Sequence, residues 1–168
     1  MKKPELLAPA GDMEKLKFAL LYGADAVYLG GKNWSLRAAA VNFSLDEISQ
    51  AVKIVHDLNK KLYVTVNILA HNQDLTSLPD YLKSLVEINV DGVIVSDPGI
   101  LQMAIEYAPN LNVHLSTQAN VTNWAAADFW HSIGVDRIVL ARELSLKEIT
   151  EIKQKTKVQI EVFVHGAM

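Results

Sequence analysis

The sequence contains no cysteine among its 168 residues. This excludes disulfide bonds and every thiolate-ligated metal or iron–sulfur site within the chain. No apolar run approaches the ~20 residues of a membrane span, and no apolar stretch follows the N-terminal lysines as it does in a signal peptide. Neither sign of charge dominates, because 16 basic and 19 acidic residues give a net charge of −3. Bulk charge therefore does not indicate a nucleic-acid binder, and we expect a cytoplasmic protein without a membrane partner.

Apolar residues make up 50% of the chain, which excludes intrinsic disorder. Short runs rich in Val, Ile, Leu and Tyr are typical of strands, and they alternate with segments of helical periodicity. Strands are expected at residues 5–8, 25–29, 62–67, 92–96, 111–116, 136–141 and 159–165, and helices at residues 13–22, 45–59, 78–88, 99–107, 123–132 and 146–155.

Helix boundary signals support this reading. Two Ser-x-x-Glu capping boxes begin at Ser44 and Ser145, and Asp97-Pro98 places a capping residue before a proline. An internal repeat also ends three helices: a Gly or Asn, one further residue and an Asp that opens the next strand. Its copies are Gly23-Ala24-Asp25, Asn89-Val90-Asp91 and Gly134-Val135-Asp136.

Regular strand–helix alternation makes the strands parallel and leaves two architectures open, a (β/α) barrel and an open doubly wound sheet. The strands at 62–67, 111–116 and 159–165 each have one apolar and one polar or mixed face. A doubly wound sheet is covered on both faces, so the alternation favours a barrel with a partly polar interior. A closed barrel needs eight strands and usually ~250 residues. We therefore predict an α/β fold, an incomplete TIM-like (β/α) barrel of seven parallel strands and about six helices. Residues 1–168 would be the N-terminal part of the domain, ending before the eighth strand.

Both architectures bind ligands at the carboxyl ends of the strands. Asp12 and Asp97 lie there, although a helix N-cap is their more ordinary role. Gly30 and Gly31 could approach a phosphate, but no phosphate-loop motif follows, so a turn is the better interpretation. Arg37 either grips a carboxylate or phosphate or pairs with an acidic residue of its own loop.

Later strand ends add further candidates. His114 lies on the interior face, where a hydrogen-bonded core histidine is the ordinary alternative to a base. No nucleophile elbow surrounds Ser116, which argues against a serine hydrolase. Arg142 and Glu143 could form an internal ion pair without a catalytic role. His165 is the most suggestive, although no histidine spacing here matches a zinc motif.

Several stretches together resemble a known family. They are ELLAPAG at 5–11, GADAVYLGG at 23–31, LRA at 36–38 with NF at 42–43, HLSTQAN at 114–120, LARELS at 140–145 and EVFVHGAM at 161–168. In order and spacing they are similar to the collagenase-like peptidases of unknown catalytic type, the peptidase U32 family. The resemblance covers essentially the whole chain.

The resemblance implies a TIM-like barrel at the N-terminal end of a longer protein. Members are labelled proteases or collagenases, while others support hydroxylation of tRNA uridine or ribosomal RNA cytidine. The hydroxylating members are expected to hold an iron–sulfur cluster through cysteines, and the hydroxylation is tied to prephenate. The family signature continues from the His-Gly-Ala-Met pattern into a cysteine, whereas this chain ends at Met168. We therefore expect a cluster in the full-length protein, no cofactor in this fragment, and an inactive fragment.

Matching the family motifs residue by residue gives a candidate pocket. Arg37 and Arg142 would anchor a dicarboxylate such as prephenate, while His165 and Glu143 would handle protons. No metal-ligating set is assigned. The candidate substrate-binding residues are Arg37, Asn42, Ser116, Gln118 and Arg142, and the candidate catalytic residues are His165, Glu143 and His114.

Three functions remain open on the sequence alone. The first is part of a protein that supports prephenate-dependent tRNA hydroxylation, with tRNA as its partner. The second is a genuine peptidase, although no catalytic dyad or zinc motif is apparent. The third is a non-enzymatic assembly module. Because the first and last strands would lack a neighbour, we also expect self-association through open strand edges.

Overall fold

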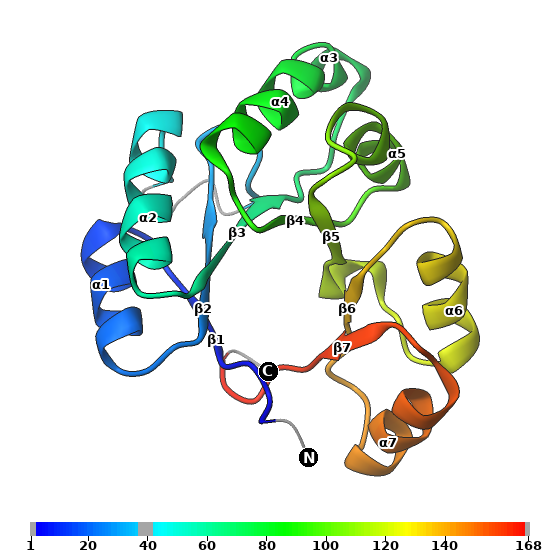
Figure 1. Ribbon diagram of the computed structural model, residues 1–168. Coiled ribbons are helices and arrows are strands. Elements are labelled where there is room, and N and C mark those ends of the chain that lie inside the picture. The colour runs from blue at the N-terminus through cyan, green and yellow to red at the C-terminus, as the bar shows by residue number, and fades with distance from the viewer. Residues whose placement is uncertain (1–2, 37–41, 167–168) are drawn as a thin grey trace.

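A computed structural model describes residues 3–36 and 42–166, and its strands form one parallel sheet in which each strand pairs with the next (Figure 1). The sheet curls and the helices ring its outer side. A doubly wound sheet would reverse its strand order and carry helices on both faces, so that alternative is wrong and the incomplete TIM-like barrel is confirmed. The strands are β1 (Leu7–Pro9), β2 (Ala26–Gly30), β3 (Lys61–Val66), β4 (Gly92–Val95), β5 (Asn112–Leu115), β6 (Arg137–Val139) and β7 (Gln159–Glu161).

The described residues form seven α-helices rather than about six. The addition is α3 (Asn72–Leu75), a single turn too short to produce a periodic sequence pattern. A 3₁₀ turn, η1 (Thr117–Ala119), follows β5. The predicted helices are α1 (Met13–Leu21), α2 (Leu45–Asp57), α4 (Leu78–Ile88), α5 (Pro98–Tyr107), α6 (Trp124–Ser132) and α7 (Leu146–Lys155).

The predicted helix boundaries are confirmed. Ser44 and Ser145 each form a complete capping box with the glutamate three residues later. Gly23, Asn89 and Gly134 adopt positive φ angles of 97°, 66° and 103° at helix ends. Local side-chain chemistry therefore sets where these helices start and stop.

The aspartates of the internal repeat have one shared role at the amino ends of the strands. The carboxylate of Asp91 accepts the backbone N–H of Leu62 at 2.8 Å, and that of Asp136 accepts the N–H of Val113 at 2.8 Å. Asp25 repeats the contact with the segment before β1, where Leu6 donates at 2.9 Å. The repeat thus fastens the starts of β1, β3 and β5 to the turns that lead into β2, β4 and β6.

Side chains alternate between two environments along each strand. Those pointing outward, such as Val64, Val93 and Val113, are buried against the helices in the main apolar core. Those pointing inward form a small apolar group of Ala26, Tyr63 and Ile94 with polar neighbours. The predicted division into an apolar outer face and a partly polar interior is confirmed.

The barrel has two sheet edges, because β1 pairs only with β2 and β7 only with β6. Strand β7 is also shorter than the predicted 159–165, since β6 ends at Val139 and residues 162–166 have no strand to pair with. The described ranges contain no eighth strand. They also contain no helix that combines the length and apolar character needed to cross a membrane.

Candidate functional site

A hydrogen-bonded group of neutral residues lies at the carboxyl ends of β3, β4 and β5, and we call Asn67, Ser96, Ser116 and Gln118 the mouth group. The Asn67 amide nitrogen donates to Gln118 Oε1 at 2.7 Å, and the Ser116 hydroxyl donates to the same oxygen at 3.1 Å. Gln118 Nε2 in turn donates to the backbone carbonyl oxygen of Asn67 at 3.4 Å. The Ser96 hydroxyl donates to the same backbone oxygen at 3.5 Å. Two predicted residues, Ser116 and Gln118, are therefore brought together, with Asn67 linking them to β3.

Asn67 also holds the start of the long loop after β2. Its backbone N–H donates to the Trp34 carbonyl at 2.9 Å, and its side-chain oxygen accepts the Leu36 N–H at 3.3 Å. The predicted Arg37 follows directly in sequence but lies outside the described residues. The loop that carries it is thus anchored at the mouth group by Asn67, a residue that the pocket assignment from sequence did not include.

The two glycines after β2 allow the loop ends to approach the sheet. A Cβ at Gly30 would lie 2.5 Å from Ser35 Oγ and 3.0 Å from Asn42 Oδ1, which puts Asn42 close to the end of β2. Gly31 forms a bridge with Phe43, the residue after Asn42. The predicted turn lies just after the pair, at residues 32–34, while Gly30 ends β2 and Gly31 forms the bridge, so the glycines provide close backbone approach.

His114 lies on β5, two positions before Ser116 and deeper in the barrel. It is 3% exposed, its ring centroid is 4.4 Å from that of Tyr63, and its Nδ1 has no hydrogen-bond partner. Burial, aided by the charge of Arg137, lowers the pKa of His114 to about 3. The imidazole is therefore neutral at physiological pH. It is buried like a core histidine, but among the described residues the hydrogen bond expected of one is absent at Nδ1.

The remaining predicted residues lie apart from His114. Arg142 and Glu143 are exposed in the β6–α7 connection, where the Arg142 guanidinium lies 5.4 Å from the centroid of the Phe163 ring. His165 is exposed in the irregular segment after β7 rather than at a strand end. In the described part of the chain, His114, Glu143 and His165 form no hydrogen bonds with one another. Their catalytic roles stay predictions.

An ionic group that the sequence reasoning missed occupies the amino end of the barrel interior. Arg137 Nη1 lies 2.7 Å from Glu5 Oε1 and 3.5 Å from Glu161 Oε2. The Tyr63 hydroxyl donates to Glu5 at 3.2 Å, and the Lys61 ammonium lies 3.3 Å from the same carboxylate. These contacts join the segment before β1 to β6 and β7 on the side where the sheet is open.

The two carboxyls of this ionic group differ electrostatically. Burial acts to raise the pKa of Glu5, but its hydrogen bond to Arg137 and the charges of Arg137 and Lys61 hold it below its usual value. Burial dominates at Glu161 and raises its pKa, although Arg137 opposes the shift. The inward position of Arg137 could have been predicted from the alternation of side chains along a strand. Ile138 faces outward, so the preceding Arg137 must face inward.

Within residues 3–36 and 42–166, no cluster of three or more His, Asp or Glu side chains could hold a metal ion. The mouth group offers amide and hydroxyl groups. Such a site can bind a polar ligand by hydrogen bonds. It holds no nucleophile next to a base, because the Ser116 hydroxyl donates to Gln118.

Comparison with known proteins identifies relatives of the chain. Residues 11–168 match the family model of Peptidase family U32. The chain is 53% identical over 167 residues to tRNA hydroxylation protein P1 of Bacillus subtilis (strain 168), covering 99% of this chain and 40% of that protein. It is 46% identical over 169 residues to tRNA hydroxylation protein P of Escherichia coli (strain K12), covering 100% of this chain and 37% of that protein.

A solved structure supports the same fold. The U32 peptidase Mk0906 aligns with a TM-score of 0.74 at 18% identity, covering 96% of this chain and 70% of that chain. At this identity the likeness concerns the fold alone. The chain spans about two fifths of the length of the two tRNA hydroxylation proteins. Because the family model matches nearly the whole chain, the chain belongs to peptidase family U32.

Proposed function

We propose that this chain is the N-terminal barrel part of a protein that supports hydroxylation of tRNA, and that the mouth group binds the nucleotide to be modified. The proposal is supported by relatives named tRNA hydroxylation proteins at 53% and 46% identity. The main structural support is the pair of amides, Asn67 and Gln118, which are hydrogen-bonded to each other at the carboxyl end of the barrel.

Amide pairs suit recognition of a pyrimidine base. Uracil presents two carbonyl acceptors and one N–H donor, and each amide supplies both kinds of group. The Gln118 amide is exposed, while Asn67 is half-buried and held by the loop at Trp34 and Leu36. One amide is thus fixed and the other can adjust, so a flipped-out base could form hydrogen bonds without displacing charged groups.

Prephenate is the proposed co-substrate, and Arg142 is its proposed anchor. The exposed guanidinium can form paired hydrogen bonds with a carboxylate, and its stacking on Phe163 limits its freedom before binding. Arg37 would supply the second cation from the loop that Asn67 anchors. Glu143 and His165, exposed in neighbouring segments, are the proposed proton-transfer groups.

An iron–sulfur cluster does not fit the residues of this chain. Such clusters are held by cysteine thiolates, and the sequence has none. In this proposal any cluster belongs to another part of a longer protein, and no chemical step is assigned to it here. The 168 residues would then be the N-terminal part of the barrel domain, inactive alone, with an eighth strand added beyond them.

The open edges carry a further part of the proposal, self-association of the 168-residue chain. Strands β1 and β7 each have one unpaired side, and Val164 after β7 is 77% exposed. Sedimentation velocity should show dimers or larger species that grow with concentration. A strictly monomeric chain at high concentration would contradict association through these edges.

The proposed location is the cytoplasm. The function is tested in a strain that lacks the gene. The full-length gene is reintroduced as wild type, Asn67→Ala, Gln118→Ala or the control Gln154→Ala, an exposed amide on α7. Mass spectrometry of tRNA nucleosides should show hydroxyuridine restored by the wild type and by the control, and reduced in both mouth-group variants. Unchanged hydroxyuridine in the deletion strain, with no second copy of the gene, would refute the function.

A peptidase is the competing activity named by the family. The described residues favour RNA modification, because Ser116 is hydrogen-bonded to an amide rather than to an imidazole. Incubating the full-length protein with gelatin should release no fragments. Cleavage that is lost in Ser116→Ala but kept in Gln154→Ala would support the peptidase instead.

A further inference from the structure

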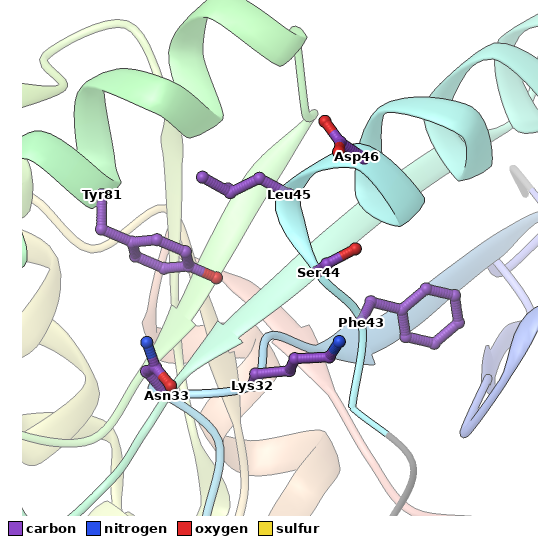
Figure 2. A pocket seen from close by; sticks show the side chains of 7 residues that line it. All are labelled: Lys32, Asn33, Phe43, Ser44, Leu45, Asp46 and Tyr81. Carbon is purple, nitrogen blue, oxygen red and sulfur yellow. The ribbon is translucent and has the colours of Figure 1, made fainter.

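A cavity lies between the start of α2 and the side of α4 (Figure 2). Its volume is about 470 Å³. Phe43, Leu45 and the Tyr81 ring supply its apolar surface, while Lys32, Asn33 and Asp46 supply polar groups. Lys32, Asn33 and Asp46 are exposed, so the cavity opens to solvent.

The aromatic wall of the cavity is fixed in place. The Tyr81 ring stacks on Trp34 with a centroid separation of 5.7 Å and an interplanar angle of 24°. The Tyr81 hydroxyl lies against Gly31, where a Cβ would collide with it. This hydroxyl is buried without a hydrogen-bond partner, and burial raises its pKa, so it remains a protonated donor. Because that hydroxyl is buried, the ring itself is what faces a ligand, and a fixed aromatic surface suits a flat one.

The charges around the cavity narrow the ligand class. Lys32 is only weakly engaged, because its Nζ lies 3.9 Å from Glu47 Oε2, and it can turn toward a phosphate. Asp46 provides a carboxylate on the same rim, which disfavours a simple anion. A carboxylate next to an aromatic wall instead accepts hydrogen bonds from an exocyclic amine, as acidic side chains do with cytosine. A nucleotide whose base carries an amino group matches the aromatic wall, the Lys32 ammonium and the Asp46 carboxylate.

From these contacts we infer that the cavity binds an unstacked nucleotide with an amino-bearing base, cytidine being the smallest example. Lys32 contacts its phosphate, Asp46 accepts a hydrogen bond from the amino group of the base, and Tyr81 lines the base. Within the proposed function, on which this step rests, the occupant is a neighbour of the modified nucleotide in the same RNA strand.

The connection between the cavity and the mouth group supports that arrangement. Residues 32–36 run from the cavity to the mouth group, where Asn67 binds both Trp34 and Leu36. The cavity and the mouth group therefore share one short, anchored segment. A single RNA strand crossing this face can place adjacent bases in the two positions.

The binding test uses the 168-residue chain and two nucleotides that differ at one position of the base. Cytidine 5′-monophosphate carries an amine where uridine 5′-monophosphate carries a carbonyl oxygen that Asp46 would repel. Isothermal titration should give tighter binding of the cytidine nucleotide by at least about fivefold. Asp46→Asn should remove that preference. Lys32→Ala should weaken the binding of both nucleotides by a similar factor.

Two control substitutions lie on α2, the helix that carries Asp46. Asp57→Asn and Lys53→Ala make the same changes in charge on exposed residues, and Asp57 is about 16 Å along α2 from Asp46. Both controls should bind like the wild type. Equal binding of the two nucleotides by the wild type, no binding of either at millimolar concentration, or an equal effect of Asp57→Asn would overturn the inference.

The cellular assay separates this inference from the function it rests on. If cavity variants lose the nucleotide preference while the deletion strain keeps normal hydroxyuridine, the proposed function is wrong and the inference of a nucleotide-binding cavity is still supported. If mouth-group variants lose hydroxyuridine while the wild-type chain shows no nucleotide preference, the function stands and the cavity inference is wrong.

Discussion

The two carboxylates of the ionic group should contribute unequally to stability, so that replacing Glu5 destabilises the chain and replacing Glu161 does not. In Glu5→Gln, Arg137 and Lys61 lose a charged partner, although the amide oxygen can still accept one hydrogen bond. A net hydrogen bond to a charged group contributes roughly 1.5–3 kcal/mol, and the Glu5 side chain is 24% exposed, so the lower end applies. We expect the free energy of unfolding at pH 7 to fall by about 1.5–2 kcal/mol. For a chain of this length the melting temperature should fall by roughly 3–8 °C.

Glu161→Gln is the matched control, because it removes the other carboxylate that faces Arg137. Burial outweighs the attraction at Glu161, whose contact with Arg137 is 3.5 Å, so the ionised form is poorly compensated. Removing its charge should leave stability at pH 7 unchanged or slightly higher. Urea denaturation followed by tryptophan fluorescence measures both variants against the wild type.

The pH dependence follows from the directions of the two pKa shifts. Glu5 has a lowered pKa in the folded state, so its contribution is present above its unfolded pKa and is lost as the pH falls through the folded value. Glu161 has a raised pKa, so its contribution is present at acidic pH and is lost as the pH rises through the folded value. The deficit of Glu5→Gln should therefore shrink toward acidic pH. Equal destabilisation by both variants at pH 7 would refute the reasoning.

Three further predictions concern single contacts, each measured by the same denaturation assay. Asp91→Asn should cost about 1–2 kcal/mol, because the carboxylate accepts both the Leu62 N–H at 2.8 Å and an imidazole nitrogen of α2 at 2.9 Å; an unchanged midpoint would contradict the role of the repeat. Ser44→Ala should cost about 1 kcal/mol through loss of the α2 capping box, and Ser44→Asp should recover most of it. Gly31→Ala should destabilise the chain by roughly 1–3 kcal/mol through collision with the Tyr81 hydroxyl. Adding Tyr81→Phe should relieve part of that loss. If the changes in unfolding free energy of the two substitutions are purely additive, the collision is excluded.

The fold was predictable because its signals are local. Capping boxes at Ser44 and Ser145 and left-handed residues such as Gly23 fix helix ends without reference to tertiary contacts. Alternation along β3 and β5 then separates a barrel from a doubly wound sheet. The end of β7 was not predictable in this way, since residues 162–164 are apolar enough for a strand but have no strand beside them to pair with.

The candidate site was predictable only in part, because sequence position gives the end of a strand but not the partner of a side chain. Ser116 and Gln118 were identified from their strand end, and the structure adds Asn67 as the residue that joins them to the loop. The ionic group depends on a contact between Glu5 and Arg137 across 132 positions. No local pattern encodes such a pair, and only curling of the sheet brings it together.

The two ends of the barrel interior differ in a way that separates stability from binding. Charged side chains gather at the amino end, where Arg137 ties β6 to the segment before β1 and holds the open side of the barrel. Neutral amides and hydroxyls gather at the carboxyl end, where Asn67 and Gln118 could exchange their mutual hydrogen bond for bonds to a base. Because the anchoring charges are at the opposite end, ligand binding at the mouth group need not disturb the contacts that hold the barrel together. Substitutions at Glu5 should therefore change the unfolding midpoint. Under the proposed function, substitutions at Gln118 should change RNA modification with little effect on stability.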